Sequence, residues 1–250
     1  MPQWLVAGLW GCLAGSALLL GAFIGYFAHL PQRFVAAVMA VGAGVLISAL
    51  SFELMQEAAD RGGMKPAAVG FVAGALVYSV ANLLVSRYGA KHRKRSGEQQ
   101  PSEDEAQGSG VAIAVGALLD GIPESIVIGL SLLAGKGVSV VAVAAVFLSN
   151  LPEGLSSASG MKRAGRSFRY VFGVWGGIAA LSGVASLVGY VAFAGASAGL
   201  IAAITATAAG AILAMLADTM MPEASHGSHE LTGLLTVLGF LVAFVLHTLS

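Results

Sequence analysis

Charged residues and cysteines are scarce in this chain of 250 residues. Lys, Arg, Asp and Glu together make up 10% of it, against about 25% in a typical soluble domain. Cys12 is the only cysteine, so neither a disulfide bond nor a cluster of thiolate metal ligands can form within one chain. Aromatic residues make up 8% of the sequence, whereas hydrophobic residues make up 57%. This composition excludes a soluble domain with a polar surface and indicates a membrane protein.

Eight apolar stretches are each long enough to cross a bilayer, which takes about 20 residues of α-helix. They cover approximately residues 4-28, 34-58, 66-88, 110-134, 138-160, 168-194, 197-221 and 231-249. Nothing remains for a soluble domain, so the sequence predicts an all-α polytopic membrane helix bundle, with residues 1-250 forming one transmembrane domain. No charged segment precedes the first stretch and no cleavage site of small residues ends it, so we expect a helix there and not a cleaved signal.

Residues 90-110 form a polar stretch between the third and fourth spans. A basic cluster, Lys91-His92-Arg93-Lys94-Arg95, is followed by acidic residues among Ser, Gln and Gly. The stretch cannot bury enough apolar surface to fold by itself. We therefore expect a flexible cytoplasmic loop, solvated or in contact with anionic lipid headgroups.

The distribution of basic residues predicts the orientation of the spans, because Lys and Arg favour the cytoplasmic side. If the N-terminus lies outside, all of the 13 basic residues except Arg61, Lys65 and Lys136 lie in the cytoplasm. The sequence therefore predicts that both termini are extracytoplasmic.

Two similar acidic motifs lie within the fourth and fifth spans. They are Asp120-Gly121-Ile122-Pro123-Glu124-Ser125 and Ser149-Asn150-Leu151-Pro152-Glu153-Gly154. Ionisable groups inside a membrane are costly and mark functional sites, and a proline before each glutamate removes one helical hydrogen bond. Both motifs begin about ten to twelve residues into their spans, which at 1.5 Å per residue places them near the midplane.

The spacing within the motifs puts their polar side chains on common helix faces. Residues three or four apart share a face, so Asp120 lies with Glu124, and Ser149 and Asn150 lie with Glu153. The middle of the spans holds no Lys, Arg or His that would neutralise the acids, so converging carboxylates must take up protons or bind a metal ion. Oxygen ligands with one amide suit Mn²⁺, Fe²⁺ or weakly held Zn²⁺. A bundle held together by protonated acids and the amide, without an ion, remains an alternative.

Further polar residues lie towards the two ends of this predicted path. Glu53 and Glu57, near the outer end of the second span, form either an entrance or a solvated helix end. A sparse cluster near the inner end of the seventh span would release an ion: Asp218, Glu223, His226 and His229, with Glu230. We expect His29 and His247, at helix ends, to be interfacial anchors and not ligands.

Four pairs of glycines spaced by three residues predict close helix packing, either inside the bundle or at the interface of a homodimer. The pairs are Gly11 and Gly15, Gly21 and Gly25, Gly70 and Gly74, and Gly173 and Gly177.

The chain resembles the ZIP family of divalent-metal transporters over its whole length. The two midplane motifs are similar to the paired metal-binding patterns of that family, which end in Pro-Glu-Gly or close to it. Glu53-Leu54-Met55-Gln56-Glu57-Ala58 is similar to its His-Leu-Leu-Pro-Glu-Ala segment, and Asp218-Thr219-Met220-Met221-Pro222-Glu223-Ala224 resembles the corresponding segment of the seventh span.

The resemblance implies a 3+5 arrangement of eight helices with both termini outside. It also implies a transporter in the plasma membrane, or the inner membrane of a bacterium, that moves Zn, Fe, Mn, Co or Cd ions as substrate towards the cytoplasm. Neither enzymatic activity, a prosthetic group nor a nucleic-acid partner is expected.

Departures from the family pattern change the expected metal site. Asp120 and Gly121 stand where the family usually has His and Asn, and Ser149 stands where it has His or another side-chain ligand. The sixth span has Ala180-Leu181-Ser182-Gly183 where a further glutamate is often found. We therefore expect one principal site of Asp120, Glu124 and Glu153, assisted by Asn150 and Ser149.

Other functions fit parts of the sequence. A proton-coupled transporter of a small organic solute would use the same acids, but Phe147 is the only aromatic residue beside the motifs. An intramembrane hydrolase would need a His-Glu-xx-His motif, or a Ser or Cys with an activating histidine in the membrane, and the sequence has neither. A membrane protein that binds a metal ion without moving it remains open.

Overall fold

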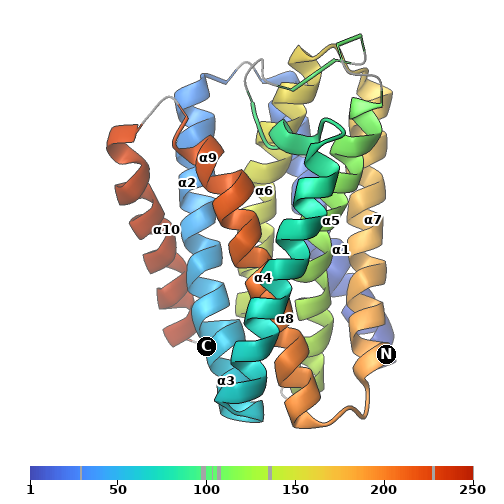
Figure 1. The fold of residues 1–250 in the computed structure, drawn as a ribbon, viewed down its shortest axis with the longest axis vertical. Coiled ribbons are helices and arrows are strands. Elements are labelled where there is room, and N and C mark those ends of the chain that lie inside the picture. Colours follow the sequence, from blue (N-terminus) through green and yellow to red (C-terminus); the bar gives the residue numbers. More distant parts are fainter. Residues whose placement is uncertain are drawn as a thin grey trace.

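The computed structural model describes residues 1–28, 30–96, 100–102, 104–105, 108–134, 137–226 and 229–249. Within these ranges every regular element is helical, and eight helices are long and apolar enough to span a membrane. They run side by side as one bundle (Figure 1). The predicted all-α class and the predicted number of spans are therefore confirmed.

Six of the spans are single α-helices: α1 (Gln3–Phe27), α4 (Met64–Ser86), α5 (Ser109–Ser131), α6 (Val140–Arg163), α7 (Phe168–Phe193) and α10 (His229–Thr248). The second span joins α2 (Gln32–Ala49), η1 (Leu50–Met55) and α3 (Gln56–Gly62), and the seventh joins α8 (Ala198–Met215), η4 (Leu216–Met220) and α9 (Met221–Ala224). Short 3₁₀ turns follow α4 at η2 (Ala90–His92) and α5 at η3 (Leu132–Ala134).

Both composite spans contain a π-helical segment and run a few residues beyond the predicted ends. η1 carries Glu53 and η4 carries Asp218, which fits the tendency of π-helical turns to occur at functional sites. The second span continues to Gly62 because Glu57 and Arg61, one turn apart, form an ion pair of 2.9 Å. Gly63 then ends it with a φ of 86°.

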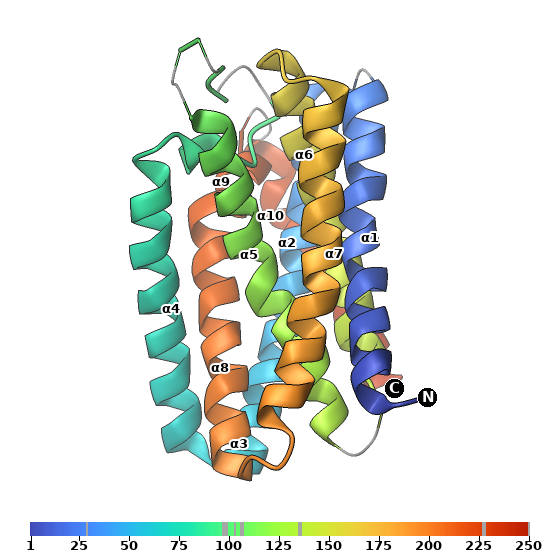
Figure 2. The ribbon, with the colours of Figure 1, turned by 90° about the vertical axis from the view of Figure 1, so that its right-hand side faces the viewer.

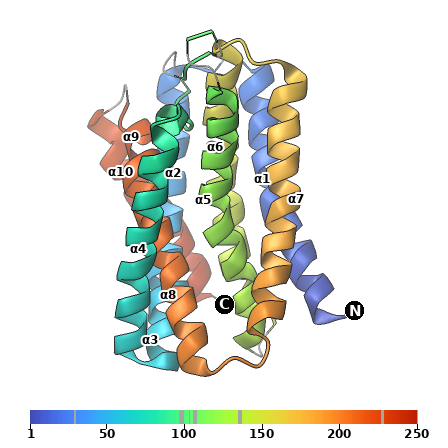
Figure 3. The same ribbon diagram turned by 45° about the vertical axis from the view of Figure 1, so that its right-hand side comes forward.

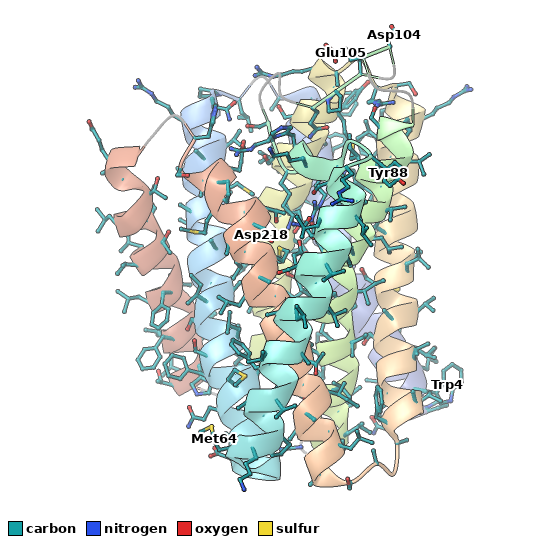
Figure 4. The ribbon with its side chains drawn as sticks, viewed as in Figure 1. Trp4, Met64, Tyr88, Asp104, Glu105 and Asp218 are labelled. Carbon is teal, nitrogen blue, oxygen red and sulfur yellow. The ribbon has the colours of Figure 1, made fainter. Side chains whose placement is uncertain are left out.

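The two termini lie at the same end of the bundle, which we call the terminal end (Figure 2). The connection from α4 to α5 lies at the opposite end, the loop end. In Figure 4, Trp4 and Met64 are labelled towards the terminal end, and Tyr88 and Asp104 towards the loop end.

The helices form two groups. In the first helix group, α1 packs against α6 and α7, and α5 packs against α7. In the second helix group, α4 packs against α8, α10 packs against α2, and α3 packs against α8. Figure 3 shows the two groups next to each other, and α5 and α6 line the seam between them on one side. The acidic motifs therefore face a boundary between two packed units.

Glycines let several of these helices approach closely. A Cβ atom added at Gly74 of α4 would lie 1.9 Å from the carbonyl oxygen of Thr207 on α8, and one at Gly21 of α1 would lie 2.1 Å from that of Leu151 on α6. The first three predicted glycine pairs thus pack inside the bundle. In the described part of the chain, a Cβ atom at Gly173 or Gly177 of α7 would meet nothing within 4 Å.

Candidate cation site

The three predicted core carboxylates are all buried between the helix groups. Asp120 and Glu124 lie on α5 and are each 1% exposed, and Glu153 lies on α6 and is 4% exposed. Pro123 and Pro152 are accommodated inside these two helices, which continue past them. The sequence therefore identified the buried acids of the seam.

The expectation that no cation neutralises these acids is wrong. Arg93 donates from Nε to Oδ2 of Asp120 at 2.8 Å and from one terminal nitrogen to Oδ1 at 2.7 Å, a two-pronged ion pair. The ammonium of Lys94 lies 2.8 Å from Oε2 of Glu153 and 3.3 Å from Oδ2 of Asp120. Both cations come from the connection between α4 and α5.

Arg93 and Lys94 of the basic cluster are correspondingly not solvated, whereas Lys91 is exposed. Arg93 is 1% exposed and Lys94 is 3% exposed. Burial of charge is costly unless the charge is paired and hydrogen-bonded, and here the acids of α5 and α6 supply that pairing. Residues 93–96, which we call the inserted segment, therefore belong to the interior of the bundle.

Arg93 has an acceptor for each of its five N–H groups, the full donor capacity of a guanidinium. Besides Asp120, it donates to the amide oxygen of Asn82 at 2.9 Å, to the carbonyl oxygen of Ala90 at 3.1 Å and to the hydroxyl of Tyr78 at 2.8 Å. The Tyr78 hydroxyl in turn donates to Asp120 at 2.7 Å. The arginine thus bonds both α4 of the second helix group and α5 of the first.

The end of the inserted segment reaches Glu223 of α9, which is fully buried. Arg95 approaches this carboxylate at 3.4 Å, and the backbone N–H of Ser96 donates to it at 3.0 Å, with a further bond from the Ser96 hydroxyl. Gln32 also donates to Glu223 at 3.1 Å, and the hydroxyl oxygen of Ser156 lies 3.2 Å from the carboxylate. Three consecutive basic residues therefore meet carboxylates from three different helices.

The backbone of the inserted segment is bonded as well. The hydroxyl of Ser156 on α6 donates to the carbonyl oxygen of Lys94. The side-chain amide nitrogen of Gln100, which has two N–H groups, lies 3.0 and 2.9 Å from the carbonyl oxygens of Arg93 and Arg95 and 3.1 Å from that of Ser157 on α6. The segment is therefore fixed by its main chain in addition to its charges.

Burial and charge act in opposite directions on Lys94. Burial by itself would lower the pKa of its ammonium group, but the carboxylates of Asp120 and Glu153 outweigh that effect and raise the pKa above its ordinary value. Lys94 therefore remains a cation at physiological pH.

Glu124 differs from the other two core acids. Neither of its carboxylate oxygens has a hydrogen-bond partner among the residues that the structure describes. Because Arg93 and Lys94 already balance Asp120 and Glu153, Glu124 is the acid of this group left without a partner of opposite charge in hydrogen-bond contact.

Separate cavities lie between the terminal end and Glu124. An open cavity of about 610 Å³ is bordered by Glu53, Glu57, Asp60 and His247. A cavity of about 20 Å³ also borders Glu53 and Glu57, and another of about 20 Å³ lies between Glu53 and Glu124 among apolar side chains. Each small cavity has room for roughly one water molecule. Glu53 borders all three cavities and so stands between the opening and Glu124.

Glu53 is held in place by groups from two other helices. Ser139, the N-cap residue of α6, donates its hydroxyl to Glu53 at 2.8 Å, and Nδ1 of His247 on α10 contacts the other carboxylate oxygen. The Phe52 ring stacks on His247 at 5.7 Å between centroids. His247 was expected to be an anchor at the membrane interface; it instead contacts Glu53, one of the two predicted entrance acids.

Two predicted assisting ligands have other partners. The Ser149 hydroxyl donates to the carbonyl oxygen of Val146 at 2.9 Å, and the Asn150 amide donates to that of Ala14 on α1 at 3.0 Å. Within the described ranges, no group of three or more His, Cys, Asp or Glu side chains is arranged to hold a metal ion. In this conformation, cationic side chains of the chain itself occupy the position between Asp120 and Glu153.

The predicted exit residues are not gathered at one point. Glu223 faces the inserted segment, whereas Asp218 is exposed and accepts a hydrogen bond of 3.2 Å from Asn82. Figure 4 labels Asp218 between the loop end and the middle of the bundle. His226 is exposed. The side chain of His229, and the whole of His29, lie outside the described residues.

Sequence reasoning missed several residues of this network, among them Tyr78, Asn82, Arg93, Lys94, Ser156 and His247. The sequence did contain a signal for Arg93 and Lys94. The acidic motifs had no cation in any span to balance them, and a dense basic cluster lay in the connection just before the fourth span. Tyr78 and Asn82 are four residues apart and so share a face of α4. The other two are an ordinary serine and a histidine near a helix end, which carry no pattern.

No protein-family model matches the chain, and no curated protein matches it in sequence. The class that the fold defines is an eight-helix bundle of membrane-spanning length and composition. The resemblance to the ZIP family rests on the four segments named above and stays a prediction.

Proposed function

We propose that this protein is a ZIP-like transporter that moves divalent metal cations, such as Zn²⁺, Fe²⁺ or Mn²⁺, towards the cytoplasm through the carboxylates at the seam. The observation that carries the proposal is Glu124, a buried carboxylate without a hydrogen-bond partner in the described part, at the inner end of cavities bordered by Glu53. Two further acids, Asp120 and Glu153, lie behind it. Such an arrangement attracts cations and offers them oxygen ligands after they lose water.

The direction follows from the placement of charge. The wide cavity bordered by Glu53, Glu57 and Asp60 opens at the terminal end, and many of the basic residues belong to connections at the loop end. By the positive-inside rule the loop end is cytoplasmic and both termini are outside. An ion would enter past Glu53 and leave towards Glu223 and Asp218.

The two helix groups suggest how access would alternate. The acids lie at a seam between units whose helices pack mainly within their own group. A rigid-body movement of one group against the other would close the cavity at the terminal end and open the loop end, as in other carriers with a midplane site.

A second candidate is a proton-coupled transporter of a small solute. The charges of the buried residues favour this candidate. Arg93 and Lys94 already balance two of the three carboxylates. One proton on Glu124 would therefore complete the neutralisation. A third candidate, a membrane protein that binds a metal ion without moving it, has the same site and differs only in flux.

The test is metal uptake into proteoliposomes that contain a metal-sensitive dye, for Zn²⁺, Fe²⁺, Mn²⁺, Co²⁺ and Cd²⁺. Glu124→Gln should abolish uptake, while Asp104→Asn, an exposed acid of the loop end, serves as the matched control and should not. Binding without uptake would favour the non-transporting protein. Proton movement without any metal flux, measured with an internal pH dye, would favour the second candidate.

A further inference from the structure

We propose that the inserted segment is a tethered competitor for the cation site, displaced when a divalent metal ion binds between Asp120 and Glu153. This inference deepens the proposed function and rests on it. Its ligand is the divalent ion itself, and its consequence is that the full set of carboxylates becomes available only after the segment has left.

Geometry makes the two occupants mutually exclusive. The ammonium of Lys94 lies 2.8 Å from Glu153 and 3.3 Å from Asp120, so it fills the space where an ion shared by these two carboxylates would be. Arg93 takes up both oxygens of Asp120. No ion can share Asp120 with Glu153 while both cations are in place.

The exchange conserves charge inside the protein. Arg93 and Lys94 carry one positive charge each, and a divalent ion carries two. Replacing the pair by one ion leaves the sum of charges around Asp120, Glu124 and Glu153 unchanged. A monovalent ion would leave an additional buried negative charge, which is costly in a low-dielectric interior, so the exchange favours divalent ions.

The position of the segment in the chain allows it to leave. It belongs to the connection between Ser86, the last residue of α4, and Ser109, the first of α5, and not to a membrane-spanning helix. Its withdrawal towards the loop end breaks its ion pairs and the hydrogen bonds that Ser156, Gln100 and Glu223 make with its backbone. The hydrogen bonds within the membrane-spanning helices stay intact. Buried ion pairs recover little more than the cost of removing their charges from water, so the inserted and withdrawn states can be close in free energy.

Withdrawal would also release Glu223. This carboxylate accepts hydrogen bonds from the backbone and the hydroxyl of Ser96. When the segment leaves, Glu223 loses these bonds and keeps the one from Gln32, so an acid on the proposed exit side is released from the segment when an ion reaches Glu153.

Labelling of a cysteine in the segment tests this directly. Ser96 is 1% exposed, so in a Cys12→Ser, Ser96→Cys variant a membrane-impermeant maleimide added from the loop end should react slowly. Mn²⁺, which thiolates bind weakly, should accelerate the reaction at least tenfold. Lys91→Cys in the same background is the control, because Lys91 is exposed and should react quickly with or without Mn²⁺.

A second variant measures the competition itself. Lys94→Met keeps a long unbranched side chain next to Met215 but removes the charge, and it should bind Mn²⁺ at least tenfold more tightly than the wild type. Lys91→Met should leave the affinity unchanged. If Lys94→Met does not fold, the cysteine experiment decides alone.

The outcomes separate this inference from the proposed function. Metal uptake with an unchanged labelling rate, or unchanged affinity in a folded Lys94→Met, overturns the inference and leaves the proposed function standing. Failure of the wild type to bind or transport any divalent ion overturns both.

Discussion

Nζ of Lys94 lies 2.8 Å from Oε2 of Glu153, although the two residues belong to a connection and to a helix 59 positions further along the chain. Both groups are buried. A pair of this kind contributes little by itself, but removal of one partner leaves the other as an uncompensated charge in the interior. Substitutions in this pair therefore test whether the inserted segment is buried and paired as described.

Glu153→Gln should destabilise the protein by about 3–5 kcal/mol, because it leaves Lys94 buried beside a neutral amide. Lys94→Met combined with Glu153→Gln should lower the free energy of unfolding much less than the sum of the two single changes, since the double variant leaves neither charge buried without its partner. Thermal unfolding in detergent micelles measures both effects. Additive losses would show that the two side chains do not interact as described.

Glu124→Gln should behave in the opposite way, with transport lost and stability unchanged or raised. Its carboxylate has no hydrogen-bond partner in the described part, so the substitution leaves no cation unpaired. Unfolding temperature and metal uptake, measured on the same preparation, check both statements. A large loss of stability would indicate that Glu124 has a structural partner.

His247→Ala should raise the KM for metal uptake about three- to tenfold with little change in the maximal rate, because His247 holds Glu53 at the entrance and lies apart from the core acids. Thr248→Ala, at the neighbouring position, is the control: its hydroxyl bonds only the carbonyl oxygen of Val245 among the described contacts. Equal effects of the two variants would contradict a positioning role of His247.

Gly74→Ala should disrupt the packing of α4 on α8 and cost about 2 kcal/mol or more, because the new methyl group would overlap the carbonyl oxygen of Thr207. Gly177→Ala on α7 should change stability by less than about 0.5 kcal/mol, as is usual for a surface position. Detergent-solubilised yield and unfolding temperature distinguish them.

The charge of Lys94 sets a pH window for the inserted segment. Asp120 and Glu153 raise the pKa of Lys94 in the folded protein despite burial, so its stabilising contribution is fully present below the ordinary lysine value of 10.5 and is lost only as pH rises through the raised pKa. The difference in unfolding temperature between wild type and the Lys94→Met, Glu153→Gln double variant, which removes both charges of the pair, should therefore be constant from pH 6 to pH 9. A difference that shrinks within that range would mean that Lys94 loses its proton there.

The spans could be predicted from the sequence because long apolar stretches have few alternatives in a membrane. The same reasoning identified Asp120, Glu124 and Glu153, since each interrupts such a stretch. Glu53 and Glu57, predicted as an entrance or a solvated helix end, border the open cavity.

The inserted segment could not be predicted from hydropathy. Arg93 and Lys94 have no periodic pattern, and their partners lie on helices that begin well beyond the connection. The polar composition of the segment predicts that water surrounds it. In the folded protein, ion pairs with acids remote in the sequence stabilise Arg93 and Lys94 in a buried position instead. Asn150 is a case in which a predicted ligand has another partner. Its spacing places it beside Glu153, but its amide donates a hydrogen bond to a backbone carbonyl oxygen of α1.

One guanidinium has a mechanical consequence for the seam. Arg93 bonds Asp120 in the first helix group and Tyr78 and Asn82 in the second. The groups cannot slide past each other at the loop end by a small step without losing charge-assisted hydrogen bonds on one side. Motion there therefore requires these bonds to break together, and in the proposed transport cycle Arg93 would keep the loop end closed until they do.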